Sequence, residues 1–280
     1  MTARILTVTL LIALAALALR TRAAERPKSE PAKETDVKEP TSPMLTFVQL
    51  TDSHMTADGM RTGKTGRGNL ADKLTRAVKE INELKPDFVV VTGDLVEVGT
   101  VGEYETFRRL MSKLTMPWHA VPGNHETLEG TWADFEKHLG RPRYSSFVEK
   151  NCQFILLDGS KDEKKYFSSG HVDDTQMEWL SNRLAEGKDK AQCFVLCHFP
   201  LQAKWGGHGI ANPERDRILA MLKKHKVAGF LFGHRHAHDG EYAAGTTHIL
   251  CAGVGWNFRD TEGYRVYRVH ADRTVSEWKP

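Results

Sequence analysis

Side chains that can bind metal ions follow five apolar segments of this 280-residue chain. These segments and the residues after them read LTFVQLTDSH, DFVVVTGD, PWHAVPGNHE, CFVLCHFP and AGFLFGHRH. The candidate ligands are Asp52, His54, Asp94, Asn124, His198, His234 and His236. Asp and Asn offer oxygen donors and His offers nitrogen, a combination that suits divalent transition metals. Three oxygen ligands and four imidazoles are enough for two ions.

The elements that must position these groups can be predicted from the same pattern. The predicted strands cover residues 45–50, 88–91, 118–121, 154–157, 193–197 and 229–232. Helices are predicted near residues 70–84, 174–186 and 213–225. Their starts are marked by Asn69, by Asp173 with Gln176 three residues later, and by Asn212 followed by Pro213. Alternating strands and helices are typical of an α/β layered domain.

The topology of such a domain would bring the candidate ligands together. If the strands lie in sheets with crossover helices, their carboxyl ends share one edge, where α/β proteins place ligand sites. Gly93, Gly123 and Gly233 precede three of the polar groups. Glycine permits a tight turn that points the next side chain back into a crowded site.

The pattern changes after His236, where short strand-like runs replace the alternation. They lie at residues 241–244, 247–252, 263–270 and 273–278, with turn residues and no helix between them. This arrangement indicates antiparallel strands that close a second sheet.

Taken together, the five motifs resemble those of the calcineurin-like metallophosphoesterases. They are Asp52-Ser53-His54, Gly93-Asp94, Gly123-Asn124-His125-Glu126, His198 and Gly233-His234-Arg235-His236. The resemblance covers about residues 45–250, and Gly170 to Leu180 is similar to the helix before the family's fourth motif. It implies an α/β fold in which two mixed β-sheets pack as a sandwich flanked by helices, a four-layer αββα architecture.

The resemblance also implies a division of labour within the site. One ion would be held by Asp52, His54 and His236, the other by Asn124, His198 and His234, with Asp94 bridging both. Two divalent ions of Mn, Fe or Zn would hold a hydroxide that attacks a phosphate ester, either a monoester or a diester. His125 is the implied catalytic residue, which stabilises or protonates the leaving group.

Two positions depart from relatives within that family. Purple acid phosphatases carry a tyrosine ligand three residues after the bridging aspartate, where this chain has Glu97. His54 supplies the missing ligand, so no tyrosinate-to-iron colour is expected. Relatives of the phosphodiesterase type often carry a second histidine where Cys197 stands. The finer subfamily is therefore not fixed by the motifs.

Other functions fit the sequence less well. The order His234 to Asp239 superficially resembles the His-x-His-x-Asp-His signature of metallo-β-lactamase-like hydrolases, but its last two residues are reversed. An exported nuclease of the same fold and a non-catalytic metal-binding scaffold are the alternatives. Residues 1–43 hold seven of the 39 Lys and Arg residues and five of the 36 Asp and Glu residues, which leaves the rest with a net charge of +1. That balance favours a small-molecule phosphate ester over nucleic acid.

Some loop residues near the motifs could contact substrate. Arg61, Lys64 and Arg67 lie in a glycine-containing loop after the first motif, where they could bind phosphate or simply be solvated. Trp205 to Gly209 could line the mouth of the site, and His238 is expected to be a solvated loop residue that lies close enough to touch substrate. The remaining histidines lack motif context and are expected to be structural or exposed.

The N-terminal residues have the features of a targeting segment. Arg4 precedes an apolar run from Ile5 to Leu19, which is shorter than the roughly 20 residues of a spanning helix. We therefore expect a signal peptide or N-terminal anchor at 1–24, a disordered Lys/Glu/Pro linker at 25–43 and the catalytic domain at 44–280. The protein would be exported, whether periplasmic, secreted or membrane-anchored, and would touch a membrane only through an uncleaved N-terminal segment.

The four cysteines do not indicate a disulfide framework. Cys152, Cys193, Cys197 and Cys251 all lie within or beside apolar strand-like runs. Two disulfides would be compatible with export, but buried free thiols are favoured.

Overall fold

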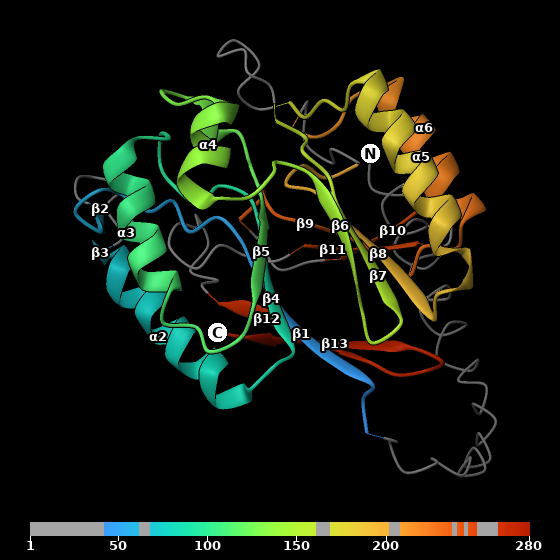
Figure 1. Cartoon of the computed structure of the whole chain (residues 1–280), viewed down its shortest axis with the longest axis horizontal. Coiled ribbons are helices and arrows are strands. Elements are labelled where there is room, and N and C mark those ends of the chain that lie inside the picture. Colours follow the sequence, from blue (N-terminus) through green and yellow to red (C-terminus); the bar gives the residue numbers. More distant parts are fainter. Residues whose placement is uncertain are drawn as a thin grey trace, which may run out of the picture. The chain divides into compact units, whose positions relative to one another are not determined.

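Two β-sheets pack face to face, with helices on both outer faces (Figure 1). The computed structural model describes residues 42–61, 68–160, 169–201, 208–236, 240–243, 246–250 and 263–280, with only the backbone of residues 61, 240–243 and 246–250. These residues belong to one compact unit, Ser42–Pro280. The predicted four-layer α/β sandwich is thereby confirmed.

The first sheet has the strand order β13-β12-β1-β4-β5. Its strands β1 (Leu45–Leu50), β4 (Phe88–Thr92) and β5 (Trp118–Val121) are parallel. Strands β12 (Tyr264–Val269) and β13 (Thr274–Lys279) are antiparallel additions on the other side of β1. The parallel part therefore presents three carboxyl ends at one edge.

The second sheet has the strand order β10-β11-β9-β8-β7-β6. Its strands are β6 (Ser145–Glu149), β7 (Cys152–Leu156), β8 (Gln192–Leu196), β9 (Gly229–Phe232), β10 (Gly240–Ala243) and β11 (Thr246–Leu250). The four central strands are parallel, and β6 and β10 are antiparallel edges. A short hairpin of β2 (Met60–Arg61) and β3 (Gly68–Asn69) lies outside both sheets.

The sheet and the strand direction predicted for the four C-terminal strands were wrong in part. All four exist, but only β10 and β11 extend the second sheet, and β11 runs parallel to β9 rather than antiparallel. The β12–β13 hairpin instead completes the first sheet against β1. Short strands carry no sequence signal for their partner, because the choice depends on which sheet edge is free.

The helices cover the outer faces of the two sheets. The first sheet is covered by α2 (Leu70–Leu84), α3 (Val101–Met111) and α4 (Trp132–Leu139), and the second by α5 (Asp174–Glu186) and α6 (Glu214–Lys224). The predicted caps Asn69 and Asp173 are confirmed, since each accepts a backbone N–H three residues later. Two short 3₁₀ turns, η1 (His125–Thr127) and η3 (Gly187–Asp189), complete the helical segments described.

Three helix features differ from the sequence-based expectation. Helices α3 and α4 were not predicted, although capping boxes at Thr100 and Thr131 mark their starts. Helix α6 begins at Glu214, and its N-cap is Pro213 rather than Asn212. Proline has no side-chain acceptor, and the acidic residues of the first turn provide the favourable charge at this end instead.

The hydrophobic core has three layers, one under each set of helices and one between the sheets. The central layer is rich in aromatic rings. Phe47 is fully buried, stacks on Phe88 and Tyr267 at 5.3 and 4.6 Å between ring centroids, and meets Phe154 and Phe194 edge-on. These contacts join residues of both sheets, so the sheets are held at a fixed separation.

A buried amide connects the two sheets near the carboxyl ends of their strands. Gln49 donates to Thr92 Oγ1 at 2.9 Å in its own sheet and to the Phe232 carbonyl at 3.1 Å in the other sheet. Its oxygen accepts from the Tyr267 hydroxyl at 2.8 Å. The amide therefore has partners on both its nitrogen and its oxygen, which fixes the relative position of the strand ends.

The predicted targeting segment at 1–24 and most of the linker at 25–43 lie outside the described residues. Among the described residues, no helix is long and apolar enough to span a membrane. Cys152, Cys193 and Cys197 are buried and free, as favoured from the sequence, whereas Cys251 lies outside the described part.

Candidate metal centre

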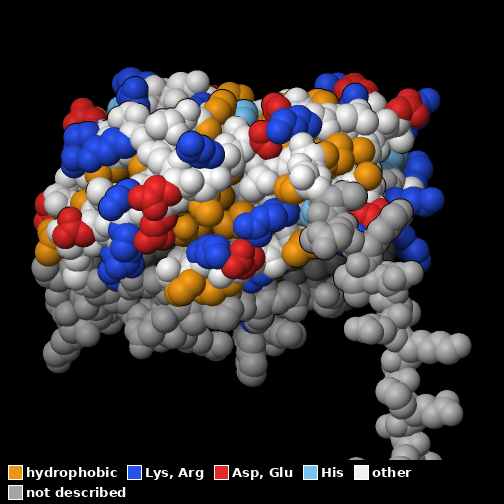
Figure 2. All heavy atoms as spheres, turned by 90° about the horizontal axis from the view of Figure 1, so that it is seen from below, with side chains coloured by type: hydrophobic (Ala, Val, Ile, Leu, Met, Phe, Trp, Pro, Cys, Tyr) orange, Lys and Arg blue, Asp and Glu red, His pale blue; other side chains and the backbone are white. Residues whose placement is uncertain are grey.

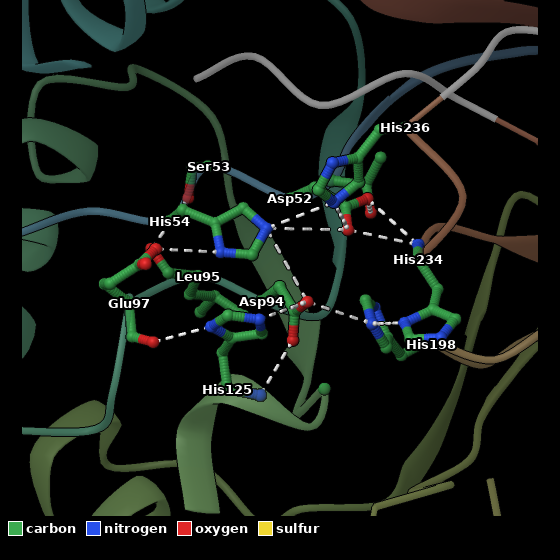
Figure 3. A network of polar contacts seen from close by, with 12 residues as sticks. Asp52, Ser53, His54, Asp94, Leu95, Glu97, His125, His198, His234 and His236 are labelled. Atoms are coloured by element: carbon green, nitrogen blue, oxygen red, sulfur yellow. Dashed lines mark hydrogen bonds and ion pairs between the residues drawn. The ribbon is translucent and has the colours of Figure 1, made fainter. Parts of the chain in front are cut away.

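All seven predicted ligands lie just beyond the carboxyl ends of strands, and the six Asp and His residues among them converge, with Asp94 at the centre (Figure 3). Asp52 and His54 follow β1, Asp94 follows β4, Asn124 follows β5, His198 follows β8, and His234 and His236 follow β9. Asn124 lies between Gly123 and His125, and the backbone of His125 donates to Asp94 Oδ1 at 3.0 Å. Residues far apart in the sequence thus meet at one edge of the sandwich.

The converging side chains form two groups that share one member. The potential ligand atoms of Asp52, His54, Asp94 and His236 lie within 4.8 Å of one another. Those of Asp94, His198 and His234 do so as well. Asp94 belongs to both groups, which is the geometry a bridging carboxylate requires. The division of individual ligands between two ions stays a prediction.

Distances within the groups fit metal coordination. Asp94 Oδ2 lies 3.2 Å from His198 Nε2 and 3.6 Å from His54 Nε2, while Asp52 Oδ1 lies 3.1 Å from His236 Nε2. The imidazole nitrogens of His54 and His236 are 3.2 Å apart, and those of His198 and His234 are 3.1 Å apart. Two nitrogen ligands of a tetrahedral ion would be about 3.3 Å apart, so each pair could hold one ion with little adjustment.

Hydrogen bonds around the groups orient the ligand atoms. His198 Nδ1 lies 2.8 Å from the Thr92 carbonyl, to which it donates, so Nε2 is the nitrogen that points at Asp94. The Asp52 carboxylate accepts from Thr51 Oγ1 at 2.6 Å and from the His234 backbone N–H at 3.1 Å. Such partners fix the tautomer and rotation of a ligand before any metal arrives.

Backbone strain is concentrated at the same positions. Five of the seven predicted ligands have a positive φ, namely Asp52, His54, Asp94, His234 and His236. Residues other than glycine adopt this conformation at a cost of order 1 kcal/mol each, and such strain clusters at functional sites. Gly93 has a φ of 87°, and a Cβ there would lie 2.5 Å from His198 Nδ1. Glycine is therefore required at this position both by conformation and by the closeness of a ligand ring.

A buried acceptor provides an independent test of whether the site suits a metal. Asn124 is 6% exposed, and no described residue donates a hydrogen bond to its Oδ1 atom. Buried polar atoms normally have a partner, so an orphan oxygen on the residue before His125, whose backbone N–H contacts Asp94, indicates a missing electrophile. A divalent transition metal would satisfy it, since oxygen and imidazole donors are the ligands these ions take.

Electrostatics in the site keep the shared carboxylate ionised and one of its histidines neutral. Burial opposes ionisation of Asp94, but His198, His125 and His54 outweigh it and hold the pKa of this carboxyl well below its usual range. Burial together with His198 lowers the pKa of His234 to about 3, so this ring is neutral. Burial opposes the charged form of His198, yet the Asp94 charge raises its pKa to about 9. An ion bound by His198 would replace that proton.

One residue of the site was given no role by the sequence, although it belongs to a motif. Glu126 is fully buried, and its carboxylate accepts the backbone N–H groups of Asp94, Leu95, Val96 and Gly123. Burial and the Asp94 charge raise its pKa to about 7. The carboxylate joins the loop after β4 to the loop after β5 and so positions Asp94 against Asn124. Residue type and spacing alone cannot reveal such main-chain partners.

The other residues considered in the sequence are placed as follows. The Arg61 side chain, Lys64, Arg67, His238 and residues 205–207 lie outside the described part. His208 is exposed, with its ring 6.0 Å from that of His234. His119 stacks on Phe147, and His171 contacts Glu214, which are structural roles as expected.

Comparisons with known proteins agree with this geometry. A model of the family described as calcineurin-like phosphoesterase matches residues 45–238. A probable glycerophosphodiester phosphodiesterase of Arcobacter nitrofigilis is 28% identical over 207 residues, covering 69% of this chain and 72% of that protein. The 3′,5′-cyclic adenosine monophosphate phosphodiesterase of Escherichia coli K12 is 27% identical over 250 residues, covering 82% and 87%. The crystal structure of a dimetal phosphatase from Danio rerio has a TM-score of 0.71 at 18% identity, covering 85% and 96%, which shows the same fold.

The position of Glu126 gives the first testable prediction. Glu126→Ala leaves several buried N–H groups without an acceptor, at about 1–3 kcal/mol for each group that water cannot reach. The metal-free variant should therefore lose about 3 kcal/mol or more of unfolding free energy in urea, and its manganese content should fall. The exposed residue Glu105 on α3 offers a control, and Glu105→Ala should change stability by less than about 0.5 kcal/mol. Equal stability of the two variants would contradict the role given to Glu126.

Proposed function

The chain belongs to the calcineurin-like phosphoesterase family, and we propose that its substrate is a small phosphodiester such as a cyclic nucleotide or a glycerophosphodiester. The protein is a hydrolase of phosphoric ester bonds that uses two divalent transition metal ions. Oxygen and imidazole ligands accept Mn, Fe and Zn alike. The observation that carries the function is the single carboxylate, Asp94, shared by two groups of metal-binding side chains.

We further propose the ligand assignment that the family resemblance implies. The first ion would be held by Asp52, His54 and His236, the second by Asn124, His198 and His234, and both by Asp94. The shared ligand and the two short nitrogen–nitrogen distances support this division. When bound, two such ions activate water as a nucleophile and stabilise the charge on the phosphoryl oxygens.

His125 is the residue that we assign to the leaving group. Its Nδ1 donates to the Glu97 carbonyl at 2.6 Å, and its Nε2 lies on the other side of the ring, 3.9 Å from Asp94 Oδ2. The imidazole is therefore held at the edge of the metal groups with one nitrogen directed towards the reacting centre. An alkoxide leaving group needs a proton or a hydrogen bond when the ester bond breaks, and this nitrogen can supply it.

Two observations support a small diester over a polymer. The curated relatives reported above are named as phosphodiesterases of glycerophosphodiesters and of a cyclic nucleotide. Among the described residues on the face shown in Figure 2, positive and negative side chains are interspersed and form no continuous basic stripe. Long polyanions bind through many Lys and Arg contacts, so this surface and the near-neutral chain do not favour nucleic acid.

Export remains a proposal that depends on the first 43 residues. Arg4, the apolar run and the Lys/Glu/Pro-rich stretch support it. Cell fractionation should find the protein outside the cytoplasm or attached to the membrane by its N-terminal segment, and an intact soluble cytoplasmic chain would contradict the proposal.

A substrate panel tests the proposed function. Metal-free protein should be inactive, and reconstitution with Mn²⁺ should restore hydrolysis. With bis(p-nitrophenyl) phosphate, a cyclic nucleotide, glycerophosphocholine and p-nitrophenyl phosphate, we expect kcat/KM for the best diester to exceed that for the monoester at least about tenfold, or about 1.4 kcal/mol in transition-state stabilisation. A preference for the monoester would contradict the diester proposal, and efficient cleavage of DNA or RNA would support the nuclease alternative.

A substitution at His125 tests the leaving-group role. His125→Ala should keep both metal ions, because the assignment gives His125 to neither. Hydrolysis of an alkyl diester should slow by about 10²–10⁴-fold, the usual contribution of general acid catalysis, whereas an aryl diester should slow less because nitrophenolate leaves without a proton. Equal losses for both esters would indicate stabilisation of phosphoryl oxygens instead. Loss of one ion would make His125 a ligand.

A further inference from the structure

Glu97 contacts two histidines of the metal centre through different parts of the residue (Figure 3). Its carboxylate oxygen Oε2 lies 3.2 Å from His54 Nδ1. Its backbone carbonyl lies 2.6 Å from His125 Nδ1. In both rings the opposite nitrogen, Nε2, faces Asp94 Oδ2, at 3.6 Å for His54 and 3.9 Å for His125. One residue thus lies behind two imidazoles that point at the same carboxylate.

The main chain around Glu97 is fixed in place. Met55 forms backbone hydrogen bonds to both sides of Val96. Its N–H donates to the Leu95 carbonyl at 3.0 Å, and its carbonyl accepts from the Glu97 N–H at 3.1 Å. Met55 is fully buried. The two segments that carry His54 and Glu97 are therefore paired through their backbones, which holds the two side chains next to each other.

Charge and exposure make the carboxylate effective at this position. The His54 side chain is fully buried, and the Glu97 side chain is 21% exposed. A carboxylate that accepts the Nδ1 proton of a metal-binding histidine fixes the tautomer, holds the ring rotation and raises the basicity of the other nitrogen. The Glu97 carboxylate lies within ion-pair distance of His54 Nδ1, on the side of the ring away from Asp94.

We propose that Glu97 is a positioning residue with two separable roles. Its side chain directs His54 Nε2 towards the first ion, and its backbone carbonyl directs His125 Nε2 towards the leaving group. The inference rests on the ligand assignment proposed above, in which His54 binds a metal and His125 does not. It follows that a side-chain substitution should weaken one ion and leave the function of His125 intact.

A different role can be tested in the same experiment. His54, Glu97 and His125 offer ligand atoms within 4.8 Å of one another, so the three could instead hold a cation themselves. The wild-type protein would then bind three ions per chain, whereas positioning by Glu97 requires two.

Metal titration of Glu97 variants measures the side-chain role directly. Glu97→Gln keeps an acceptor oxygen and removes the charge, and Glu97→Met removes both. Calorimetric titration of the metal-free proteins with Mn²⁺ should show one of two ions bound about 10–100-fold more weakly, with the larger loss in Glu97→Met, and the other ion nearly unchanged. Glu105→Gln makes the same change on an exposed face of α3 and should leave both affinities as they are.

The outcomes separate the inference from the function it rests on. Wild-type affinities in both Glu97 variants, or three ions in the wild-type protein, would overturn the positioning role. Equal weakening of both ions together with a lower melting temperature of the metal-free variants would show a general structural role instead. A wild-type protein that binds fewer than two ions would contradict the proposed metal centre rather than the role of Glu97.

The role of the Glu97 backbone carbonyl is tested by comparing the hydrolysis rates of alkyl and aryl diesters. The Glu97→Gln variant keeps the carbonyl, so the ratio of its rates on alkyl and aryl diesters should equal that of the wild-type enzyme. His125→Ala should lower that ratio. If Glu97→Gln lowers it to the same extent, the side chain and not the carbonyl orients His125, and the separation of roles is wrong.

Discussion

A single buried carboxylate, Asp94, imposes the main constraint on this structure. It lies 1% exposed at the junction of the two sheets, where an unpaired charge would be costly. Imidazoles from both sheets surround it: His54 comes from the first sheet, and His198 comes from the second. Their pairing with Asp94 requires the strand ends of the two sheets to stay in register. The stability of the sandwich and the chemistry of the site are therefore linked through this one group.

The inter-sheet core and the buried polar residues keep that register. Rings around Phe47 set the separation of the sheets, and Gln49 connects the end of β1 to the end of β9. Glu126 then gathers the loops after β4 and β5 through four backbone N–H groups. Phe47 lies in the core between the sheets, Gln49 near the strand ends, and Glu126 directly behind the backbone of Asp94. Positive φ values at the ligands show that the surrounding packing is strong enough to support local strain.

The elements that carry the site could be predicted from the sequence because each has a local signal. Strands β1, β5 and β9 have the predicted bounds, since their apolar runs end at Thr51, Pro122 and Gly233. Helices α2 and α5 also have the predicted bounds, and their starts are marked by the N-caps Asn69 and Asp173. By contrast, the partners of β11 and β12 depend on which strands are already in place, and no local pattern encodes that.

In the candidate site, too, residues with a local sequence motif could be predicted, whereas contacts between distant parts of the chain could not. The residues that converge on Asp94 were all named from their motifs. The roles of Glu126 and Glu97 were not, because both act on backbone or ring atoms that approach only in the folded chain. A carboxylate that accepts main-chain N–H groups looks the same in sequence as a solvated one. Supporting residues of this kind therefore need the structure.

A crystal structure of the manganese-loaded protein, with anomalous difference maps at the manganese edge, tests the central claim most directly. The account predicts two manganese peaks about 3.5–4 Å apart. The Asp94 carboxylate should contact both of them. Asp94→Ala crystals grown in the same way should lack both peaks at full occupancy. A single peak in the wild-type protein, or two peaks of which only one contacts Asp94, would contradict the claim that this carboxylate organises a dinuclear centre.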